Sequence, residues 1–318
     1  MIYSFAPMEG VTTAVFRQVH ARCFPGVDRY YAPFLAPDGS GKYRLGSRRD
    51  ILPENNRDIP LVPQVLCNRA EPFLAVAREL GEMGYREVNL NLGCPSATVV
   101  PKHKGAGLLQ DLNFLDDLLA ELFSRCELQI SVKTRLGLES TAEFPAILEV
   151  YNRYPIRELI IHARDRAGMY RSRPDLDAFA AAFAASRAPV CYNGNVFSPA
   201  DRDRVCAAAE GLSRIMLGRG AVTNPALFRV LRGGRALEQA ELLDFLTRLE
   251  SAYTASGLGD HYTLGRMKEC WYYVNHMFPD CDRALRQIQK ARNLADYRDA
   301  VTQLFARQAL DPDAVFSD

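Results

Sequence analysis

Polar and reactive residues recur at the ends of short apolar runs through most of this sequence. In chain order, the run ends are Pro7-Met8, Gln64, Asn91 to Pro95, Lys133 to Arg135, His162 to Arg164, Asn193 to Asn195 and Gly218 to Gly220. They include a thiol at Cys94, an amine at Lys133 and an imidazole at His162. If the runs are parallel strands of one barrel, their carboxyl ends meet at one mouth. The residue types then suit a phosphate-bearing cofactor, with Lys133 complementing negative charge and Cys94 facing the reacting atom.

Each of these residues also has a structural explanation. Cys94 could be a buried thiol, but Gly93 and Pro95 place it on a loop that exposes its side chain. Lys133 could pair with a structural carboxylate or with an anionic ligand, because an unpaired buried ammonium is costly. His162 could be a satisfied core histidine, and with Cys94 it could instead form a nucleophile and base.

The glycine-containing run ends are equally open to two explanations. Asn193-Gly194 could form only a turn. Gly218-Arg219-Gly220 at the start of a helix could be a packing device, or its backbone N–H groups could hold a phosphate. Barrels often bind phosphate after their seventh and eighth strands, which favours the second explanation.

The elements that position these residues alternate between strand and helix. Strands are predicted at 2–6, 29–34, 61–66, 87–91, 128–133, 158–162, 189–192 and 214–217. Segments with a helical repeat of apolar residues lie between most of them, as at 71–83 and 112–123. This alternation predicts an α/β fold of the (β/α)8 TIM barrel type. A doubly wound sheet is the alternative, but no G-x-G-x-x-G follows the first strand.

Strand-like runs stop after residue 237, and only helical patterns follow. These patterns cover 238–254, 264–277 and 282–305, and the Gly233-Gly234 pair marks the junction. The segment 35–59, rich in Gly, Pro and charge, is predicted to be a loop with a short helix. The sequence therefore predicts a barrel domain at 1–235 and a small helical domain at 236–318.

Composition excludes several classes of protein. The 318 residues include 39 Lys and Arg against 38 Asp and Glu, so a net charge of +1 argues against histone-like nucleic-acid binding. None of the 8 cysteines forms a C-x-x-C pair, which indicates reduced thiols and a cytoplasmic protein. The sequence contains no H-E-x-x-H motif, so it gives no support for a metal site. It also lacks paired carboxylates at the run ends, which a glycosidase would need. No apolar run suggests a membrane span, and the first residues do not resemble a signal peptide.

The residues at the run ends, in this order, resemble the tRNA-dihydrouridine synthase family. The matching pieces are Ala6-Pro7-Met8-Glu9-Gly10, Gln64, Asn91-x-Gly-Cys94-Pro95, Gly105-Ala106-Gly107-Leu108-Leu109, Lys133-x-Arg135, His162-x-Arg164, Asn193-Gly194 and Gly218-Arg219. The likeness covers residues 1 to about 310, and the Cys94 segment followed by the glycine-rich segment is its most specific part. The form Pro7-Met8-Glu9-Gly10 is more similar to the subgroup acting on the 5′ side of the tRNA D-loop.

The resemblance implies an FMN-binding barrel that reduces the C5–C6 bond of particular uridines in tRNA, with NADPH as reductant. It implies that Pro7, Met8 and Glu9 border the flavin, that Gln64 and Lys133 contact its ring, and that His162 supports that region. Asn193, Gly194, Asn195, Gly218 and Arg219 would hold the phosphate, while Asn91, Arg135, Arg164 and Tyr170 would contact substrate. Cys94 would be the general acid that protonates C5 after hydride reaches C6. A thiol is mostly protonated at neutral pH, which suits this role.

A tRNA substrate requires cations for its phosphates and a uridine that leaves its stack. The candidates are Lys102 and Lys104 after the Cys94 loop, Arg171 and Arg173 after His162, and Arg283, Arg286 and Lys290 on one face of the terminal helix. That last stripe could also be an ordinary solvated surface. Two positions depart from the family pattern, since Asn195 replaces a common Asp and Asp165 a common Thr.

Two alternatives to this function stay open. An FMN barrel could reduce a free pyrimidine or a small enone, although a basic helical domain is not needed for such a substrate. A degenerate barrel could bind RNA without catalysis, although Cys94, Lys133 and Gly218-Arg219 together argue against it. The sequence predicts a monomer, and it does not decide which uridine is modified or whether NADPH is preferred to NADH.

Overall fold

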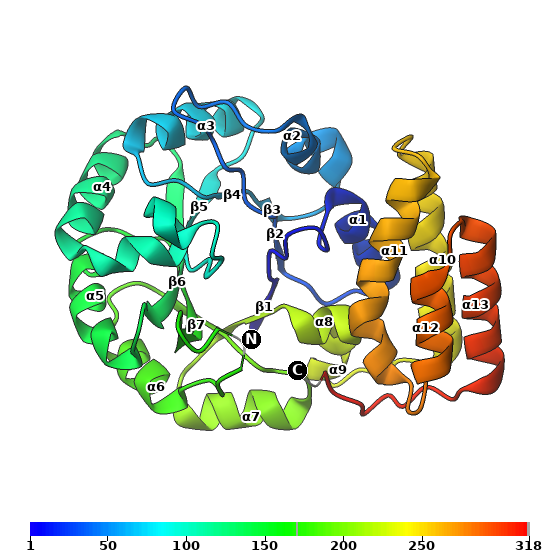
Figure 1. Ribbon diagram of the computed structural model, residues 1–318. Coiled ribbons are helices and arrows are strands. Elements are labelled where there is room, and N and C mark those ends of the chain that lie inside the picture. Colours follow the sequence, from blue (N-terminus) through cyan, green and yellow to red (C-terminus); the bar gives the residue numbers. More distant parts are fainter. Residues whose placement is uncertain (170, 317–318) are drawn as a thin grey trace.

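A ring of parallel strands forms the centre of the molecule. The computed structural model describes residues 1–169 and 171–316, and Figure 1 shows the strands encircled by helices. The strands are β1 (Ile2–Phe5), β2 (Arg29–Tyr31), β3 (Leu61–Val62), β4 (Gln64–Val65), β5 (Glu87–Leu92), β6 (Gln129–Gly137), β7 (Leu159–Asp165), β8 (Val190–Asn193) and β9 (Arg214–Leu217). Their order in the sheet is β3-β2-β1-β9-β8-β7-β6-β5-β4. The predicted TIM barrel is therefore confirmed.

One predicted strand is divided in two. The run 61–66 becomes β3 and β4, because Pro63 between them has no N–H to donate to a neighbouring strand. The carbonyl of Pro63 still accepts a 2.8 Å hydrogen bond from the backbone N–H of Asn89 in β5. Since β3 pairs with β2 and β4 pairs with β5, the divided strand closes the ring.

Helices cover the outside of the ring because each buries one apolar face on the strands. The helices that follow the strands are α1 (Ala14–Cys23), α3 (Ala70–Glu82), α4 (Leu112–Arg125), α5 (Phe144–Tyr151), α6 (Leu176–Ala185) and α7 (Pro199–Ala208). Helix α4 illustrates the rule, since Leu115, Leu119 and Leu122 are fully buried and the Asp111 carboxylate caps the helix by accepting the N–H of Phe114.

Shorter helical turns shape the loops of the barrel. They are α2 (Leu45–Ile51), α8 (Arg219–Thr223), α9 (Leu227–Leu231) and the 3₁₀ turns η1 (Pro53–Asn56), η2 (Val100–Lys102), η3 (Gly105–Gln110) and η4 (Thr141–Glu143). The segment 35–59 contains α2 and η1 within a loop, as predicted. Within the described part of the chain, no helix combines the length and the apolarity needed to cross a membrane.

The chain after the barrel is helical, with one break that the sequence did not reveal. Its elements are α10 (Gln239–Ala255), α11 (Asp260–Val274), η5 (Asn275–Met277), α12 (Asp282–Lys290) and α13 (Leu294–Arg307). The prediction of one helix over 282–305 was wrong, because Asn293 caps a new helix by accepting the N–H of Asp296. Arg283, Arg286 and Lys290 consequently lie on α12 rather than on the terminal helix.

The helical region packs directly on α1 of the barrel. Phe245 of α10 lies against Phe16, His20 and Phe24, with ring centroids 5.4–6.3 Å apart. The hydroxyls of Thr13 and Tyr253 are 2.8 Å apart, within hydrogen-bonding distance. Figure 1 shows α10 to α13 on this one side of the ring. The division into domains at 235 and 236 stays a prediction, because barrel and helices share one hydrophobic core.

A buried charge cluster closes the amino-terminal end of the barrel. Glu158, which is 0% exposed and immediately precedes β7, accepts hydrogen bonds from Arg214 at 2.9 Å and Tyr31 at 2.7 Å. Arg29 pairs with both Glu158 and Glu87. These interior carboxylates are thus paired at the end opposite to the predicted site.

We expect Glu158→Ala to lower the free energy of unfolding by about 3–5 kcal/mol, because it removes the buried carboxylate that pairs with the partly buried guanidinium groups of Arg29 and Arg214. The measurement is urea denaturation followed by circular dichroism. Glu139→Ala is the control, since the Glu139 side chain forms an exposed 3.7 Å ion pair with Arg166. Equal stability of the two variants would contradict the structural role of Glu158.

Candidate functional site

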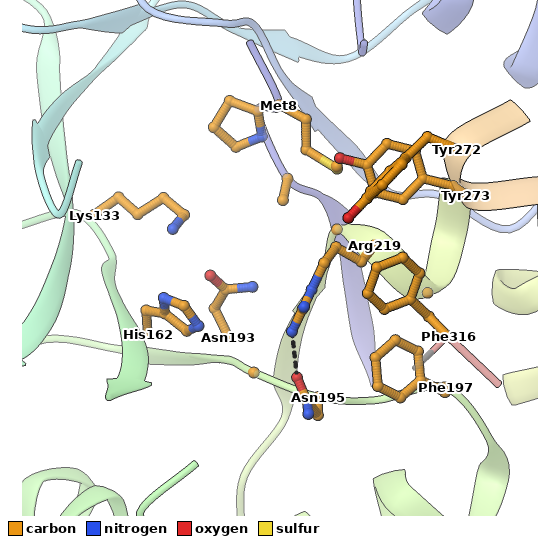
Figure 2. A pocket seen from close by; sticks show the side chains of 15 residues that line it. Met8, Lys133, His162, Asn193, Asn195, Phe197, Arg219, Tyr272, Tyr273 and Phe316 are labelled. Carbon is orange, nitrogen blue, oxygen red and sulfur yellow. Dashed lines mark hydrogen bonds between the residues drawn. The ribbon is translucent and has the colours of Figure 1, made fainter. Parts of the chain in front are cut away.

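The carboxyl ends of the strands surround a cavity of about 240 Å³. Figure 2 shows its lining side chains converging from opposite sides of the barrel mouth. Nine of the predicted site residues line it, namely Pro7, Met8, Lys133, His162, Asn193, Gly194, Asn195, Gly218 and Arg219. The ends of five separate predicted strands therefore contribute residues to one cavity at the barrel mouth.

Lys133 is the charged group that reaches into the cavity from β6. Among the described residues, its ammonium has neither an ion-pair partner nor a hydrogen-bond acceptor. Burial, assisted by the positive charge of Arg135, lowers the pKa of Lys133 to about 8. Within the described chain, Lys133 is therefore not held by an ion pair with a structural carboxylate. A cation in this position favours an anionic ligand.

His162 lies beside Lys133 at the end of β7 and is buried. Its Nε2 is 3.0 Å from Nη1 of Arg164, and a guanidinium can only donate, so Nε2 is the acceptor. The ring proton is thus assigned to Nδ1. Burial holds the pKa of His162 well below its usual range, and the charges of Arg135, Lys133 and Arg164 act in the same direction. His162 is therefore neutral and can donate a hydrogen bond through Nδ1.

Asn195 connects two arginines at the other end of the cavity. Its side-chain oxygen accepts hydrogen bonds from Arg164 at 3.1 Å and from Arg219 at 2.9 Å (Figure 2). Because an amide is neutral, it orients the two guanidinium groups without cancelling their charge. An aspartate in this position would form ion pairs with both arginines. The asparagine therefore leaves this end of the cavity more positive than an aspartate would.

Glycines let the backbone form the cavity wall. A Cβ on Gly194 would lie 2.2 Å from the hydroxyl of Tyr192, and one on Gly220 would lie 2.5 Å from the carbonyl of Val196. Neither position has room for a larger residue. Helix α8 begins at Arg219 with Gly218 as its N-terminal cap, which confirms the prediction that Gly218-Arg219-Gly220 opens a helix.

The Cys94 loop is held by a polar side chain from its own strand. The side-chain oxygen of Asn91 accepts the backbone N–H groups of Gly93 at 3.1 Å and Cys94 at 2.9 Å. The Cys94 carbonyl accepts a 3.1 Å hydrogen bond from Ala106, and a Cβ on Gly105 would lie 2.9 Å from that of Cys94. The cysteine segment and the glycine-rich segment are therefore one packed unit.

The Cys94 thiol is half-buried and lies outside the wall of the cavity. Burial raises the pKa of the Cys94 thiol, and the charges of Arg135 and Lys133 partly oppose that shift. The thiol is consequently protonated at neutral pH. It has the protonation state that a general acid requires.

Other predicted residues support the site instead of lining the cavity. Gln64 donates to Asn89 at 2.7 Å and accepts from Asn91 at 2.8 Å, so it anchors the residue that holds the Cys94 loop. Arg135 donates to the carbonyls of Gly93, Asp165 and Met169 at 2.8–3.0 Å and thereby joins the loops after β5 and β7. Contacts of Gln64 with a flavin and of Asn91, Arg135 and Arg164 with substrate stay predictions. Tyr170 lies outside the described residues.

The structure adds aromatic residues to the site that the sequence did not reveal. Phe197, Tyr272, Tyr273 and Phe316 line the cavity. The two tyrosines come from α11, and Phe316 comes from the segment after α13. Nothing local in the sequence signals that these positions meet the barrel mouth.

A second hollow, of about 1040 Å³, lies between α1, α2 and the helical region. Glu9 lines this groove and not the cavity. Arg22, Arg44, Arg49 and Arg57 are exposed along it. No carboxylate in the described chain lies within ion-pair distance of these four arginines. The abundance of charge in 35–59 was the only sequence signal for this groove.

Candidate metal ligands do not gather in the part of the chain that the structure describes. The eight cysteines are all free thiols. The site therefore consists of a cationic cavity, a protonated thiol beside it and a basic groove. Fold and site together define a (β/α)8 barrel protein whose strand ends can receive an anionic ligand.

A family model described as dihydrouridine synthase (Dus) matches residues 4–314, and the chain belongs to this family. It is 27% identical to a tRNA-dihydrouridine(16) synthase of Ralstonia nicotianae, with 95% of each chain covered. It is 30% identical to a probable tRNA-dihydrouridine synthase of Staphylococcus aureus, over 77% of this chain and 75% of that one. Among solved structures, a variant of NCR from Zymomonas mobilis has the same fold, with a TM-score of 0.51 at 15% identity over 73% of this chain and 86% of that chain.

Proposed function

We propose that this protein is an FMN-dependent tRNA-dihydrouridine synthase that reduces the C5–C6 bond of a D-loop uridine with electrons from NADPH. The observation that carries the proposal is the Lys133 ammonium, which has no partner among the described residues and lies in the cavity at the barrel mouth, near a protonated Cys94. Family membership and the names of the relatives support the substrate class.

The residues present in the cavity fit FMN. Arg219 and the backbone of Gly194 and Gly218 would hold the phosphate, because they line the cavity and combine a cation with backbone N–H groups. Lys133 and the Nδ1–H of His162 would contact the electron-rich edge of the ring. FMN supplies the two-electron reduction that amino-acid side chains cannot perform.

Cys94 would complete the reduction of uracil. Hydride addition at C6 leaves negative charge on C5 and on the C4 carbonyl oxygen of the base. The Cys94 thiol donates its proton to C5, the S–H bond breaks as the C–H bond forms, and water then reprotonates the thiolate. Because burial raises the pKa of this thiol, the proton is in place over the whole neutral pH range and is lost only at higher pH.

We propose position 16 as the target uridine. The alignment with the tRNA-dihydrouridine(16) synthase covers 95% of this chain and so includes the helical region. A relative named tRNA-dihydrouridine synthase B, from Pseudomonas syringae, matches only 70% of this chain. Because the alignment with the tRNA-dihydrouridine(16) synthase extends through the helical region, it supports a similar way of docking tRNA in the two proteins.

Cys94→Ala should lower the rate of uridine reduction about 100-fold or more, as removal of a general acid does. The measurement is anaerobic turnover with NADPH on an unmodified tRNA transcript, with dihydrouridine located by mass spectrometry. FMN content and NADPH bleaching of the flavin should match those of the wild-type protein. Cys206→Ala on α7 is the matched control.

Near wild-type turnover of Cys94→Ala would remove Cys94 from the acid role. A wild-type protein that binds FMN and oxidises NADPH but leaves every uridine intact would instead favour reduction of a small molecule. A protein that cannot bind FMN at all would overturn the cofactor assignment. Product at a position other than 16 would contradict only the proposed target.

The affinity for FMN should fall as pH rises through about 8. The pKa of Lys133 is lowered to about 8 in the free protein, so its ammonium gives up the proton and the attraction for an anion above that pH. Titration of the apoprotein with FMN, followed by flavin fluorescence, measures this dependence. Lys133→Met should bind FMN more weakly and without this decline. An identical decline in the variant would show that another group titrates.

The basic groove would give the tRNA backbone a second surface to bind. Arg44 and Arg49 are exposed in it, with no carboxylate of the described chain within ion-pair distance, and Glu9 in its wall directly follows Met8 in the wall of the cavity. We infer that the groove holds tRNA phosphates, together with the predicted contacts at Lys102, Lys104, Arg171 and Arg173. The stripe formed by Arg283, Arg286 and Lys290 on α12 is a separate candidate.

Replacing both Arg44 and Arg49 with Glu should weaken tRNA binding. The slope of log K against log salt should also become shallower by about one for each phosphate that the variant no longer binds. Fluorescence anisotropy at several salt concentrations measures both effects. Replacing Arg157 and Arg187 with Glu is the control, because both are exposed at the amino ends of β7 and β8.

The double replacement of Arg283 and Arg286 with Glu tests the α12 stripe separately. Weaker binding in this variant alone would assign the phosphates to α12 and not to the groove. Equal weakening in the groove variant and the control variant would contradict a specific role for the groove.

A further inference from the structure

The chain returns from the last helix to the barrel mouth. After α13, residues 308–316 form a strap that runs back toward the cavity, as the red end of the ribbon in Figure 1 shows. The backbone N–H of Leu310 donates to the side chain of Gln239 at 3.0 Å, and that of Asp311 donates to the carbonyl of Met277 at 2.8 Å. The strap is therefore fixed on the helical region before it reaches the barrel.

Phe316 is the residue of the strap that enters the site. It is 6% exposed, whereas Val315 beside it is 48% exposed. Its ring lies 6.3 Å from Phe197 of the barrel, 5.7 Å from Tyr273 and 4.5 Å from His276. Phe316 is thus enclosed by aromatic rings from both the barrel and the helical region, as Figure 2 shows for Phe197 and Tyr273.

The ring of Phe316 also covers one face of a cavity cation. The guanidinium carbon of Arg219 is 5.0 Å from the ring centroid, within the range of a cation–π interaction. The edge of the same guanidinium donates to Asn195 at 2.9 Å. Face and edge contacts together restrict the rotamers of Arg219 and orient it before any ligand arrives.

We propose that Phe316 is a positioning residue for cofactor binding, which holds Arg219 in the orientation that receives the cofactor phosphate. This inference rests on the proposed function, because it takes FMN as the ligand of the cavity. Preorganisation lowers the entropy cost when the phosphate binds, so it raises affinity without a contact between Phe316 and the phosphate. The strap thereby makes the helical region part of the cofactor site.

The test compares FMN affinities of apoproteins by flavin fluorescence. Phe316→Ala and Phe316→Leu should weaken binding about five- to tenfold, since both lack the π face. Phe316→Tyr should bind within about twofold of the wild type, because it retains that face. Val315→Ala is the control on the same strap and should bind as the wild type does. The melting temperature of each apoprotein reports on folding separately.

A double-mutant cycle with Arg219→Ala identifies the route of the effect. If Phe316 acts through Arg219, Phe316→Ala has no further effect on FMN affinity once Arg219 is replaced. Equal affinity of Phe316→Leu and Phe316→Tyr, or additive weakening in the double variant, would overturn the inference while leaving FMN binding intact. A wild-type protein that binds no FMN would instead overturn the proposed function itself.

Discussion

The accumulation of positive charge at the barrel mouth is the constraint on which the site depends. Lys133, Arg164 and Arg219 meet there, and burial together with neighbouring positive charge lowers the pKa of Lys133 and keeps His162 neutral. The interior carboxylate Glu158 is paired with Arg29 and Arg214 at the opposite end of the barrel. An anionic ligand beside Lys133 would therefore relieve the electrostatic cost of burying its ammonium.

The remaining polar groups of the barrel serve to fix the geometry of that charge. A chain of amide hydrogen bonds runs from Asn91 through Gln64 to Asn89 and on to Ser131. Asn91 then holds the backbone of the Cys94 loop, so the position of the thiol depends on neighbouring strands and not on the loop alone. Such networks give a single arrangement only when every member is satisfied.

The sequence predicted the strands and the residues at their ends because both carry local signals. Alternating apolar runs marked the strands, and the glycines and cations after them marked the mouth. The division at Pro63 and the break before Asn293 were missed, since the apolar periodicity continues across both. Phe316 and the groove arginines could not be predicted, because their relation to the site arises only when distant segments pack together. The position of Glu9 in the groove could not be predicted for the same reason, because the opposite wall of the groove is formed by the distant helical region.

The loop after β1 separates the two hollows and so connects their roles. Pro7 and Met8 line the cavity, whereas Glu9 and Gly10 line the groove. Arg266 of α11 donates to the carbonyl of Gly10, which fixes this loop to the helical region. A nucleic acid held by the groove arginines would meet the cofactor site across these four residues. In the proposed complex, the helical region would set the distance between the bound tRNA backbone and the reacting uridine. Phe316, which follows that region in the chain, contacts Arg219 at the far end of the cavity.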